Sequence, residues 1–483
     1  LNDMPDIVCE RCFFEEGKDI RLLVSSHPLL SFRIIFFTIS YELDYVNIIK
    51  ILRSSNIGLD AVKRNDDEPI IVGGGICIMS NPEPIYNLFD LFIMGDIEST
   101  ITSFIESFMA TKEKKKDDII GGLSTKGWVY NPKSLNVSYN EDGTLQSFVP
   151  ASFSVNPYLY EGRGLGSSTV IAHETEFSDM LLVEGTRGCP SRCPFCLLGN
   201  TYEFSYDNIL PISTQADDIG IIGGGVSFHP FIVDIVREMK AAGKRIHFPS
   251  LRIDKTPIDL IELMKDDIKT LTFGIEAGTE RLRKSIGKPI SDMQLLEKMD
   301  NILSIKPFNL KLYFMVGLFG ETINDLGGIV DTVKHIRHIM IKKGAKKGFI
   351  GSITVHASPF VPKPATPFQW LPMLDMETMK KRLVWLKREF SKVDNTYFTH
   401  ESIKYSFLQG VFSRGDRRLK EVLLRLSMGE GFSRALKQSP VNLNFYVLRE
   451  RSYDEILPWD FITSKVSKKR LYETFISLIP HTT

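Results

Sequence analysis

The sequence has few cysteines, no long apolar run and no excess of either charge. Six cysteines in 483 residues are too sparse for the disulfide framework of a small secreted protein. No stretch approaches the ~20 apolar residues that a membrane span needs, and the N-terminus lacks the charged-then-apolar layout of a signal peptide, so we expect a cytoplasmic protein. Lys and Arg number 59, as do Asp and Glu, which removes the broad electrostatic argument for a nucleic-acid binder.

What is present is the composition of a folded protein with several domains. Hydrophobic residues make up 43% and charged residues 24%, both ordinary for globular proteins. At roughly 150 residues per domain, the length predicts about three domains or two large ones. The sequence shows neither an internal repeat nor a low-complexity tract.

Strand patterns alternate with helix patterns in two parts of the chain, between about residues 29 and 108 and again from residue 179. Such alternation predicts parallel sheets with right-handed crossovers. The second part has six strand–helix units, which suggests a barrel or part of one, with its chemistry at the carboxyl ends of the strands. The six strand segments are residues 181–183, 219–222, 245–248, 270–273, 310–316 and 353–356.

Three cysteines, Cys189, Cys193 and Cys196, follow the first of these strands. Three thiols within eight residues favour a metal site over a disulfide, and thiolates select zinc, Cu(I) or iron–sulfur clusters. A four-iron cluster usually takes four cysteines, so three would leave one iron open, as in catalytic metal sites. The residues alone leave other readings open: a structural zinc completed by His229 or His247, an electron-carrying cluster, or unliganded cysteines.

The spacing Cys-x3-Cys-x2-Cys, with Phe195 before the last cysteine, resembles the signature of the radical S-adenosylmethionine (radical SAM) superfamily. The resemblance implies a 4Fe-4S cluster held by Cys189, Cys193 and Cys196, with S-adenosylmethionine bound to the open iron. It implies reductive cleavage to a 5′-deoxyadenosyl radical that acts on a substrate, small or macromolecular, which the sequence does not identify. It also implies an external one-electron reductant of the ferredoxin or flavodoxin type.

The same resemblance implies residues that bind S-adenosylmethionine at the ends of the next three strands. The glycines after the second strand would receive its amine, the Ser and Arg after the third would suit its carboxylate and ribose, and a glutamate after the fourth would point into the barrel mouth. The glutamate segment is similar to one in the elongator-like and methylthiotransferase-like branches. An ordinary turn, a helix cap and a structural salt bridge are the alternatives. With the aromatic Phe195, these residues are Gly223, Gly224, Gly225, Ser250, Arg252 and Glu276.

Residues 70–75, 81–84 and 92–96 resemble the cobalamin-binding domain that precedes many radical SAM barrels. The Asp-x-His-x-x-Gly loop, whose histidine ligates cobalt, is absent, and this argues against cobalamin as a further cofactor. A cobalamin-dependent methyltransferase and a non-catalytic iron–sulfur electron-transfer protein are the alternative functions. We therefore expect an α/β chain with four parts: a Rossmann-like, cobalamin-binding-like domain (1–110), a connector (111–175), a partial (β/α)6 barrel (176–375) and a small, mostly helical C-terminal region (376–483).

Three further features need a structural answer. Cys9 and Cys12 could hold a second metal centre or form a redox pair, and the alternative is unliganded cysteines. The cluster of charged residues 414–418 could bind an anionic substrate group, and the alternative is charge pairing at a helix end. We expect His229, His247 and His356 to be hydrogen-bonded residues rather than ligands.

Overall fold

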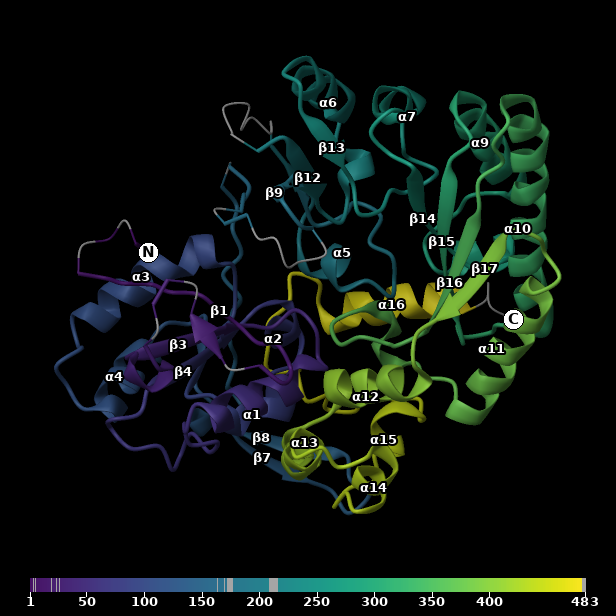
Figure 1. Cartoon of the computed structure of the whole chain (residues 1–483). Coiled ribbons are helices and arrows are strands. Elements are labelled where there is room, and N and C mark those ends of the chain that lie inside the picture. Colours follow the sequence, from purple (N-terminus) through teal and green to yellow (C-terminus); the bar gives the residue numbers. More distant parts are fainter. Residues whose placement is uncertain are drawn as a thin grey trace. The chain divides into compact units, whose positions relative to one another are not determined.

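The computed structural model (Figure 1) describes residues 1–483 except 3, 5, 19, 23, 26, 163, 169, 172–176, 208–215 and 480–483. The chain divides into two units. Unit 1 comprises Leu1–Tyr160 and Leu408–Ser464, and unit 2 comprises Glu161–Phe407 and Lys465–Thr483. The region 376–483, which we expected to form one part, is thus shared between the units. Residues 172–175 of the expected connector lie outside the described residues.

Unit 1 is built on the sheet β3–β4–β5–β6. β3 (Ile34–Thr38), β4 (Ile70–Gly74) and β5 (Leu91–Ile93) are parallel, and β6 (Val129–Tyr130) is antiparallel to β5. Because β4 and β5 are buried along their length, they are apolar throughout, as a parallel strand covered on both faces requires. The predicted alternation of strands and helices is confirmed here. The main helices are α1 (Asp44–Ser54), α3 (Ile97–Met109) and α4 (Lys116–Leu123).

Shorter elements complete unit 1. Two antiparallel hairpins stand outside the main sheet, and the C-terminal part of the unit is helical. The elements are β1 (Cys12–Phe13), β2 (Arg21–Leu22), α2 (Ile76–Ser80), β7 (Asn136–Tyr139), β8 (Leu145–Val149), α13 (Lys420–Ser427), α14 (Phe432–Lys437) and α15 (Asn444–Val447), with α12 (Ile403–Arg414) crossing into it from unit 2.

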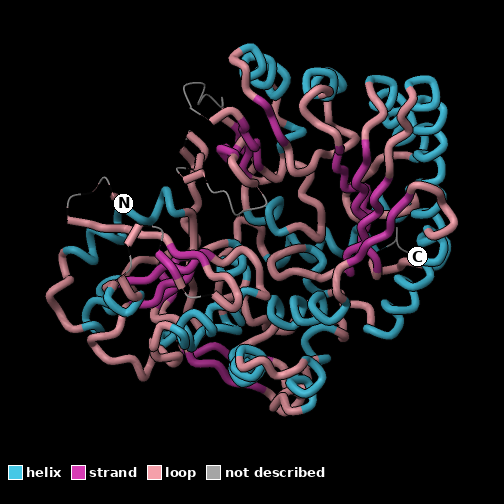
Figure 2. Tube along the Cα trace, in the orientation of Figure 1, coloured by secondary structure: helices cyan, strands magenta, loops and turns pink. Residues whose placement is uncertain are grey.

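The described residues of unit 2 form seven parallel strands in two sheets, besides the short antiparallel pair β10 (Thr186–Arg187) and β11 (Ser205–Tyr206). The first has the order β13–β12–β9 and the second the order β14–β15–β16–β17, and a parallel bridge between Leu251 and Phe273 joins them. All six predicted strands are present, and β17 adds a seventh within a region that we expected to be helical. The strands, magenta in Figure 2, are β9 (Met180–Glu184), β12 (Asp218–Ile222), β13 (Arg245–His247), β14 (Thr270–Glu276), β15 (Asn309–Val316), β16 (Ile353–Pro359) and β17 (Thr396–His400).

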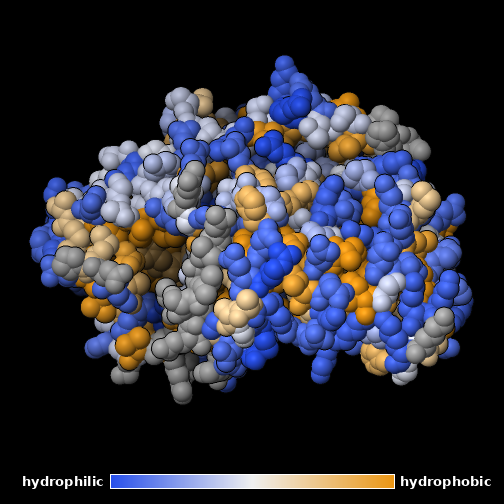
Figure 3. Space-filling view, turned by 90° about the horizontal axis from the view of Figure 1, so that it is seen from above, coloured by the Kyte–Doolittle hydropathy of each residue, from blue (hydrophilic) through white to orange (hydrophobic). Residues whose placement is uncertain are grey.

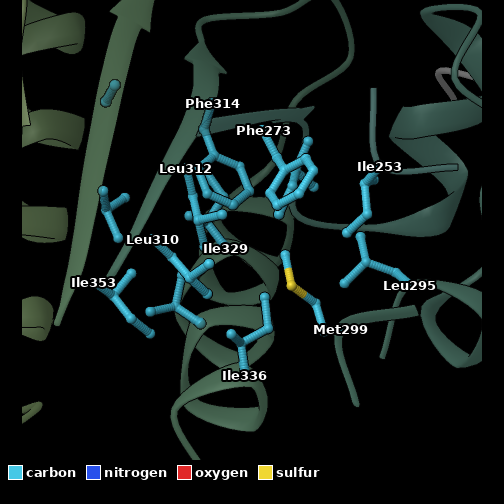
Figure 4. Packing of buried hydrophobic residues seen from close by; sticks show 14 of the residues in the cluster. Ile253, Phe273, Leu295, Met299, Leu310, Leu312, Phe314, Ile329, Ile336 and Ile353 are labelled. Atoms are coloured by element: carbon cyan, nitrogen blue, oxygen red, sulfur yellow. The ribbon is translucent and has the colours of Figure 1, made fainter. Parts of the chain in front are cut away.

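The larger hydrophobic cluster of unit 2 lies between the second sheet and its helices, and a smaller one packs on the first sheet. Burial alternates along β15, where Leu310, Leu312 and Phe314 are buried and pack with Met299 and Ile336 of the helices (Figure 4). The period of two sends the intervening side chains to the opposite face of the sheet. The helices of the unit are α5 (Leu197–Thr201), α6 (Ile232–Ala241), α7 (Ile258–Met264), α8 (Glu280–Ser285), α9 (Asp292–Ile305), α10 (Ile323–Gly344), α11 (Met376–Phe390) and α16 (Lys468–Leu478).

The surface in Figure 3 mixes hydrophilic and hydrophobic residues. Among the described residues, no helix has both the length and the apolar character that crossing a membrane demands.

Candidate functional site

The cysteine loop (residues 188–196) follows β9 and the short strand β10 (Thr186–Arg187), at the carboxyl end of the first barrel strand. Gly188 has φ +68°, and a Cβ on it would lie 2.5 Å from the carbonyl oxygen of Glu203, so only glycine fits this turn. Asn200 of α5 closes the loop, because its amide Nδ2 donates to the carbonyl oxygens of Cys193 (3.0 Å) and Cys196 (2.8 Å). The tight turn at Gly188 and the two hydrogen bonds of Asn200 thus fix the backbone that carries the cysteines.

All three thiols of this loop are free, Cys193 buried and Cys189 and Cys196 half-buried. Burial raises the pKa of the Cys193 thiol to about 11, while the cations of Lys288 and Arg252 act to lower it. Burial also raises the pKa of Cys196. Among the described residues, no group of three or more His, Cys, Asp and Glu side chains stands ready to hold a metal ion. The donor set nevertheless suits an iron–sulfur cluster, since three uncrosslinked thiols share one short loop.

Of the three glycines after β12, Gly223 lies against β10, and Gly224 and Gly225 lie against the start of the cysteine loop. Gly223 has φ +145°, and a Cβ on it would overlap the backbone of Thr186. A Cβ on Gly225 would lie 3.2 Å from the carbonyl oxygen of Gly188, and one on Gly224 would lie 3.4 Å from the same atom. The structure therefore brings the predicted glycines next to the strand and the turn that lead into the cysteines, and the absence of a Cβ on each glycine makes this close approach possible.

Arg252 reaches the cysteine loop from the segment after β13. Its Nη1 donates to Ser191 Oγ at 2.8 Å and to Cys193 Sγ at 3.8 Å, and its Nε donates to Asp254 Oδ1 at 2.6 Å. Ser250, two residues earlier, is exposed. Of the two predicted residues after the third strand, Arg252 is the one in contact with a cysteine.

Glu276 ends β14 at a bulge and has φ +71°, a left-handed conformation that is uncommon outside glycine. Its Oε1 accepts a hydrogen bond from Lys288 Nζ at 2.8 Å, and the same Nζ donates to the carbonyl oxygen of Gly274 at 2.8 Å. The sequence analysis missed Lys288. Its position one residue after Gly287, whose Cβ would lie 3.3 Å from Cys193 Cα, places it beside the loop.

Residues 360–370, a proline-rich segment that follows β16, also contact the cysteine loop. Phe368 N donates to the carbonyl oxygen of Pro194 at 3.0 Å. Next to this contact lies an apolar pocket, whose lining includes Ile286, Phe319 and Phe475. The half-buried Phe195 lies on the loop itself.

The histidines near strand ends are engaged with the protein. His229 is buried, its Nε2 lies 2.9 Å from the carbonyl oxygen of Asp207, and its Nδ1 accepts from Phe231 N at 3.1 Å. His247 Nε2 lies 2.8 Å from Asp218 Oδ1. These contacts occupy both nitrogens of His229 and one of His247, so the structure gives the zinc alternative little support.

In unit 1, the charged cluster 414–418 forms ion pairs within the protein. Arg417 Nε donates to Glu83 Oε2 at 2.7 Å and its Nη2 to Tyr130 Oη at 2.9 Å, while Arg418 Nη2 donates to Asp416 Oδ2 at 2.6 Å. The structure thus favours the alternative of charge pairing over an anionic substrate site, because the guanidinium groups of Arg417 and Arg418 already have protein acceptors. Cys9 and Cys12 are free and half-buried, with no metal-binding group among the described residues.

Unit 1 does not fit a cobalamin site of the histidine-ligated kind. Besides the missing histidine loop, its strands follow one another in chain order, β3–β4–β5–β6, so the described sheet has no reversal of strand order, where α/β folds bind ligands. The glycines at the strand ends are used by the backbone itself: a Cβ on Gly75 would lie 2.6 Å from the carbonyl oxygen of Ile39, and one on Gly95 would meet the backbone of Tyr158.

Comparison with known proteins identifies the family. Residues 183–333 match the profile described as Radical SAM superfamily, and residues 1–132 match the one described as Radical SAM proteins, N-terminal. A protein of Methanocaldococcus jannaschii described as uncharacterized is 28% identical over 404 residues, which cover 81% of this chain and 80% of that protein.

Solved structures show more distant similarity. The cobalamin-dependent S-adenosylmethionine radical enzyme OxsB with aqua-cobalamin bound is 13% identical, with a TM-score of 0.42, over 94% of this chain and 72% of that one. SuiB of Streptococcus suis bound to S-adenosylmethionine is 10% identical, with a TM-score of 0.31, over 47% of this chain and 48% of that one. At these values neither structure supports an assignment. The two family matches, together with the cysteine loop between β9 and α5, show that the chain belongs to the radical SAM superfamily. Membership of this superfamily implies S-adenosylmethionine and a 4Fe-4S cluster.

Proposed function

We propose that this protein is a radical SAM enzyme that cleaves S-adenosylmethionine reductively and uses the resulting radical on a substrate not yet identified. The observation that carries the proposal is the cysteine loop, which stands at the carboxyl end of the first barrel strand and lies close to Gly224 and Gly225 after the second. When bound, the cluster and S-adenosylmethionine supply one-electron reduction and a 5′-deoxyadenosyl radical, while the protein binds and orients them.

Cys189, Cys193 and Cys196 would hold three irons of the cluster and leave the fourth for S-adenosylmethionine. Because metal binding requires thiolates, it must overcome the raised pKa of Cys193. The nearby cations of Lys288 and Arg252 favour the thiolate. Asn200 donates to the carbonyl groups of Cys193 and Cys196, and these bonds would hold the loop in place when the cluster is bound.

Glycines 223–225 would let the end of β12 approach S-adenosylmethionine closely, because none of them carries a Cβ. Glu276 would offer a carboxylate to the ribose hydroxyls, with Lys288 as its present partner. An external one-electron donor of the ferredoxin or flavodoxin type would reduce the cluster. Cobalamin has no part in this proposal, because unit 1 lacks the features of a histidine-ligated site.

Anoxic reconstitution with iron and sulfide tests the proposal. We expect about four irons per chain and, after reduction with dithionite, formation of 5′-deoxyadenosine from S-adenosylmethionine, measured by chromatography and mass spectrometry. Cys193→Ala should end product formation and lower iron content. Cys12→Ala, a free and half-buried cysteine of unit 1, is the matched control and should retain both.

Two results would contradict the proposal. Equal product from the Cys193→Ala variant would show that the cluster is not held as described. A full cluster that undergoes reduction but cleaves no S-adenosylmethionine would support the electron-transfer alternative instead.

A further inference from the structure

Arg252 is held in place along its whole length. Its backbone N donates to Ser227 Oγ at 2.9 Å, and its carbonyl oxygen accepts from Thr256 Oγ1 at 2.7 Å. The side chain, 13% exposed, forms an ion pair through Nε with Asp254, at 2.6 Å. The guanidinium carbon lies 5.7 Å from the centre of the Phe228 ring. These contacts orient the Nη1 and Nη2 end of the guanidinium toward the cysteine loop.

This end of Arg252 contacts the cysteine loop. Nη1 is shared between Ser191 Oγ at 2.8 Å and Cys193 Sγ at 3.8 Å, and Nη2 lies 3.5 Å from the carbonyl oxygen of Gly287. Since Nε and Nη1 already have protein acceptors, the paired donors that a carboxylate would take are engaged. Arg252 is therefore placed to act on Cys193 rather than on the carboxylate of S-adenosylmethionine.

We propose that Arg252 is a positioning residue that fastens the cysteine loop and raises the reduction potential of the cluster through its charge and its hydrogen bond to the Cys193 sulfur. The inference rests on the proposed function, since it presumes a cluster on these cysteines. When the cluster gains one electron, its net charge becomes more negative by one, and a cation beside a ligating sulfur stabilises that state. Hydrogen bonds to the sulfurs and net charge are established determinants of cluster potential.

Asp254, the ion-pair partner of Arg252, allows a second test in which the reduction potential should shift in the opposite direction. Its carboxylate offsets part of the Arg252 charge, because the two side chains are 13% and 18% exposed and form a close pair. Removing the negative charge at Asp254 should leave more of the Arg252 cation acting on the cluster. Changes at the two positions should therefore move the potential in opposite directions.

The test is a potentiometric titration of the reconstituted full-length protein, without S-adenosylmethionine, in which electron paramagnetic resonance follows the reduced cluster. Arg252→Gln should shift the midpoint to a more negative value, and Arg252→Lys should shift it less, because the charge is kept but the planar fork is lost. Asp254→Asn should shift it to a more positive value. Arg245→Gln is the matched control and should leave the midpoint unchanged, since Arg245 lies on β13, the strand that precedes Arg252, and pairs with Asp218.

An Arg252→Gln protein with full iron content and the wild-type midpoint would overturn the inference and leave the proposed function standing. If Arg252→Gln takes up no iron, the Asp254→Asn variant provides the test. An unchanged midpoint in Asp254→Asn would then overturn the inference and leave the proposed function standing. A loss of S-adenosylmethionine binding in Arg252→Gln without a change of midpoint would return Arg252 to the role of a carboxylate ligand. A wild-type protein that assembles no cluster would instead reject the proposed function, and this inference with it.

Discussion

Lys288 Nζ donates to Glu276 Oε1 across 2.8 Å, and their side chains are only 13% and 18% exposed. The pair joins the strained end of β14 to the turn that follows α8. Gly287, in that turn, would carry a Cβ 3.1 Å from Pro194 if it were alanine, so the turn packs directly on the cysteine loop. The pair therefore connects the fourth strand of the barrel to the candidate cluster site.

Replacing Lys288 by Met should destabilise the protein by about 2 kcal/mol, because a mostly buried carboxylate loses its cation. Chemical denaturation of the cluster-free protein would measure this. Lys284→Met is the control, since Lys284 pairs with Glu280 at an exposed helix position and should destabilise the protein much less. Equal losses in both variants would show that the Lys288 pair is no stronger than a surface pair.

Gly188→Ala should destabilise the protein by roughly 3 kcal/mol and prevent cluster assembly. The new Cβ would have to move backbone at Glu203, which adds to the cost of a left-handed alanine. Gly243→Ala has nearly the same φ, +78°, with nothing within 4 Å of the new Cβ, so it isolates the conformational cost of about 1 kcal/mol. Thermal unfolding and iron analysis of both variants check the difference, and similar melting temperatures would argue against the steric explanation.

Asn200→Asp should reduce iron uptake during reconstitution at least severalfold. The substitution keeps the shape of the side chain but sets a carboxylate oxygen against the carbonyl oxygens of Cys193 and Cys196, which then lose their donor. Asn301→Asp on the exposed side of α9 introduces the same charge away from the loop and should load normally. Full iron content in Asn200→Asp would mean that the loop does not depend on this amide.

Ionised Asp325 should stabilise the folded protein, and this stabilisation should be lost at acidic pH. Burial acts to raise the pKa of Asp325, but hydrogen bonds from Thr279 and Thr322 and the cation of Arg281 outweigh it and lower the pKa. The folded pKa thus lies below the unfolded value of about 3.9. The stabilisation is present above that value and is lost as pH falls through the folded pKa.

Asp325→Asn should therefore destabilise the protein at pH 7 and do so progressively less below about pH 4. Urea unfolding of wild type and variant between pH 3 and pH 7 provides the comparison. A difference that stays constant over this range would show that the charge of Asp325 contributes nothing.

Cobalamin should not remain with the protein. After anoxic incubation of the reconstituted full-length chain with aquacobalamin and desalting, we expect no corrinoid absorption band, because the described sheet of unit 1 has no reversal of strand order and its strand-end glycines pack on backbone. A stoichiometric retained band would contradict this and revive the cobalamin-dependent alternative.

Local sequence chemistry was sufficient to predict the strands of the barrel and the cysteine loop. Buried parallel strands are apolar runs that end in glycine, proline or cysteine, and three thiols in eight residues have few structural explanations. β17 was missed because Thr396–His400 lacks such a run: one of its faces is polar and exposed, and it becomes a strand only by pairing with β16.

The sequence by itself was enough to recognise the superfamily, to predict the six strand segments of the barrel and to propose Cys189, Cys193 and Cys196 as cluster ligands, because each depends on short-range pattern and spacing. Only the tertiary structure decided that Arg252 turns to Cys193, that Lys288 pairs with Glu276 and that residues 408–464 group with the N-terminal unit. Partners separated by tens to hundreds of residues leave no mark on local composition. Their choice is set by which side chains folding brings within hydrogen-bonding distance and shields from water.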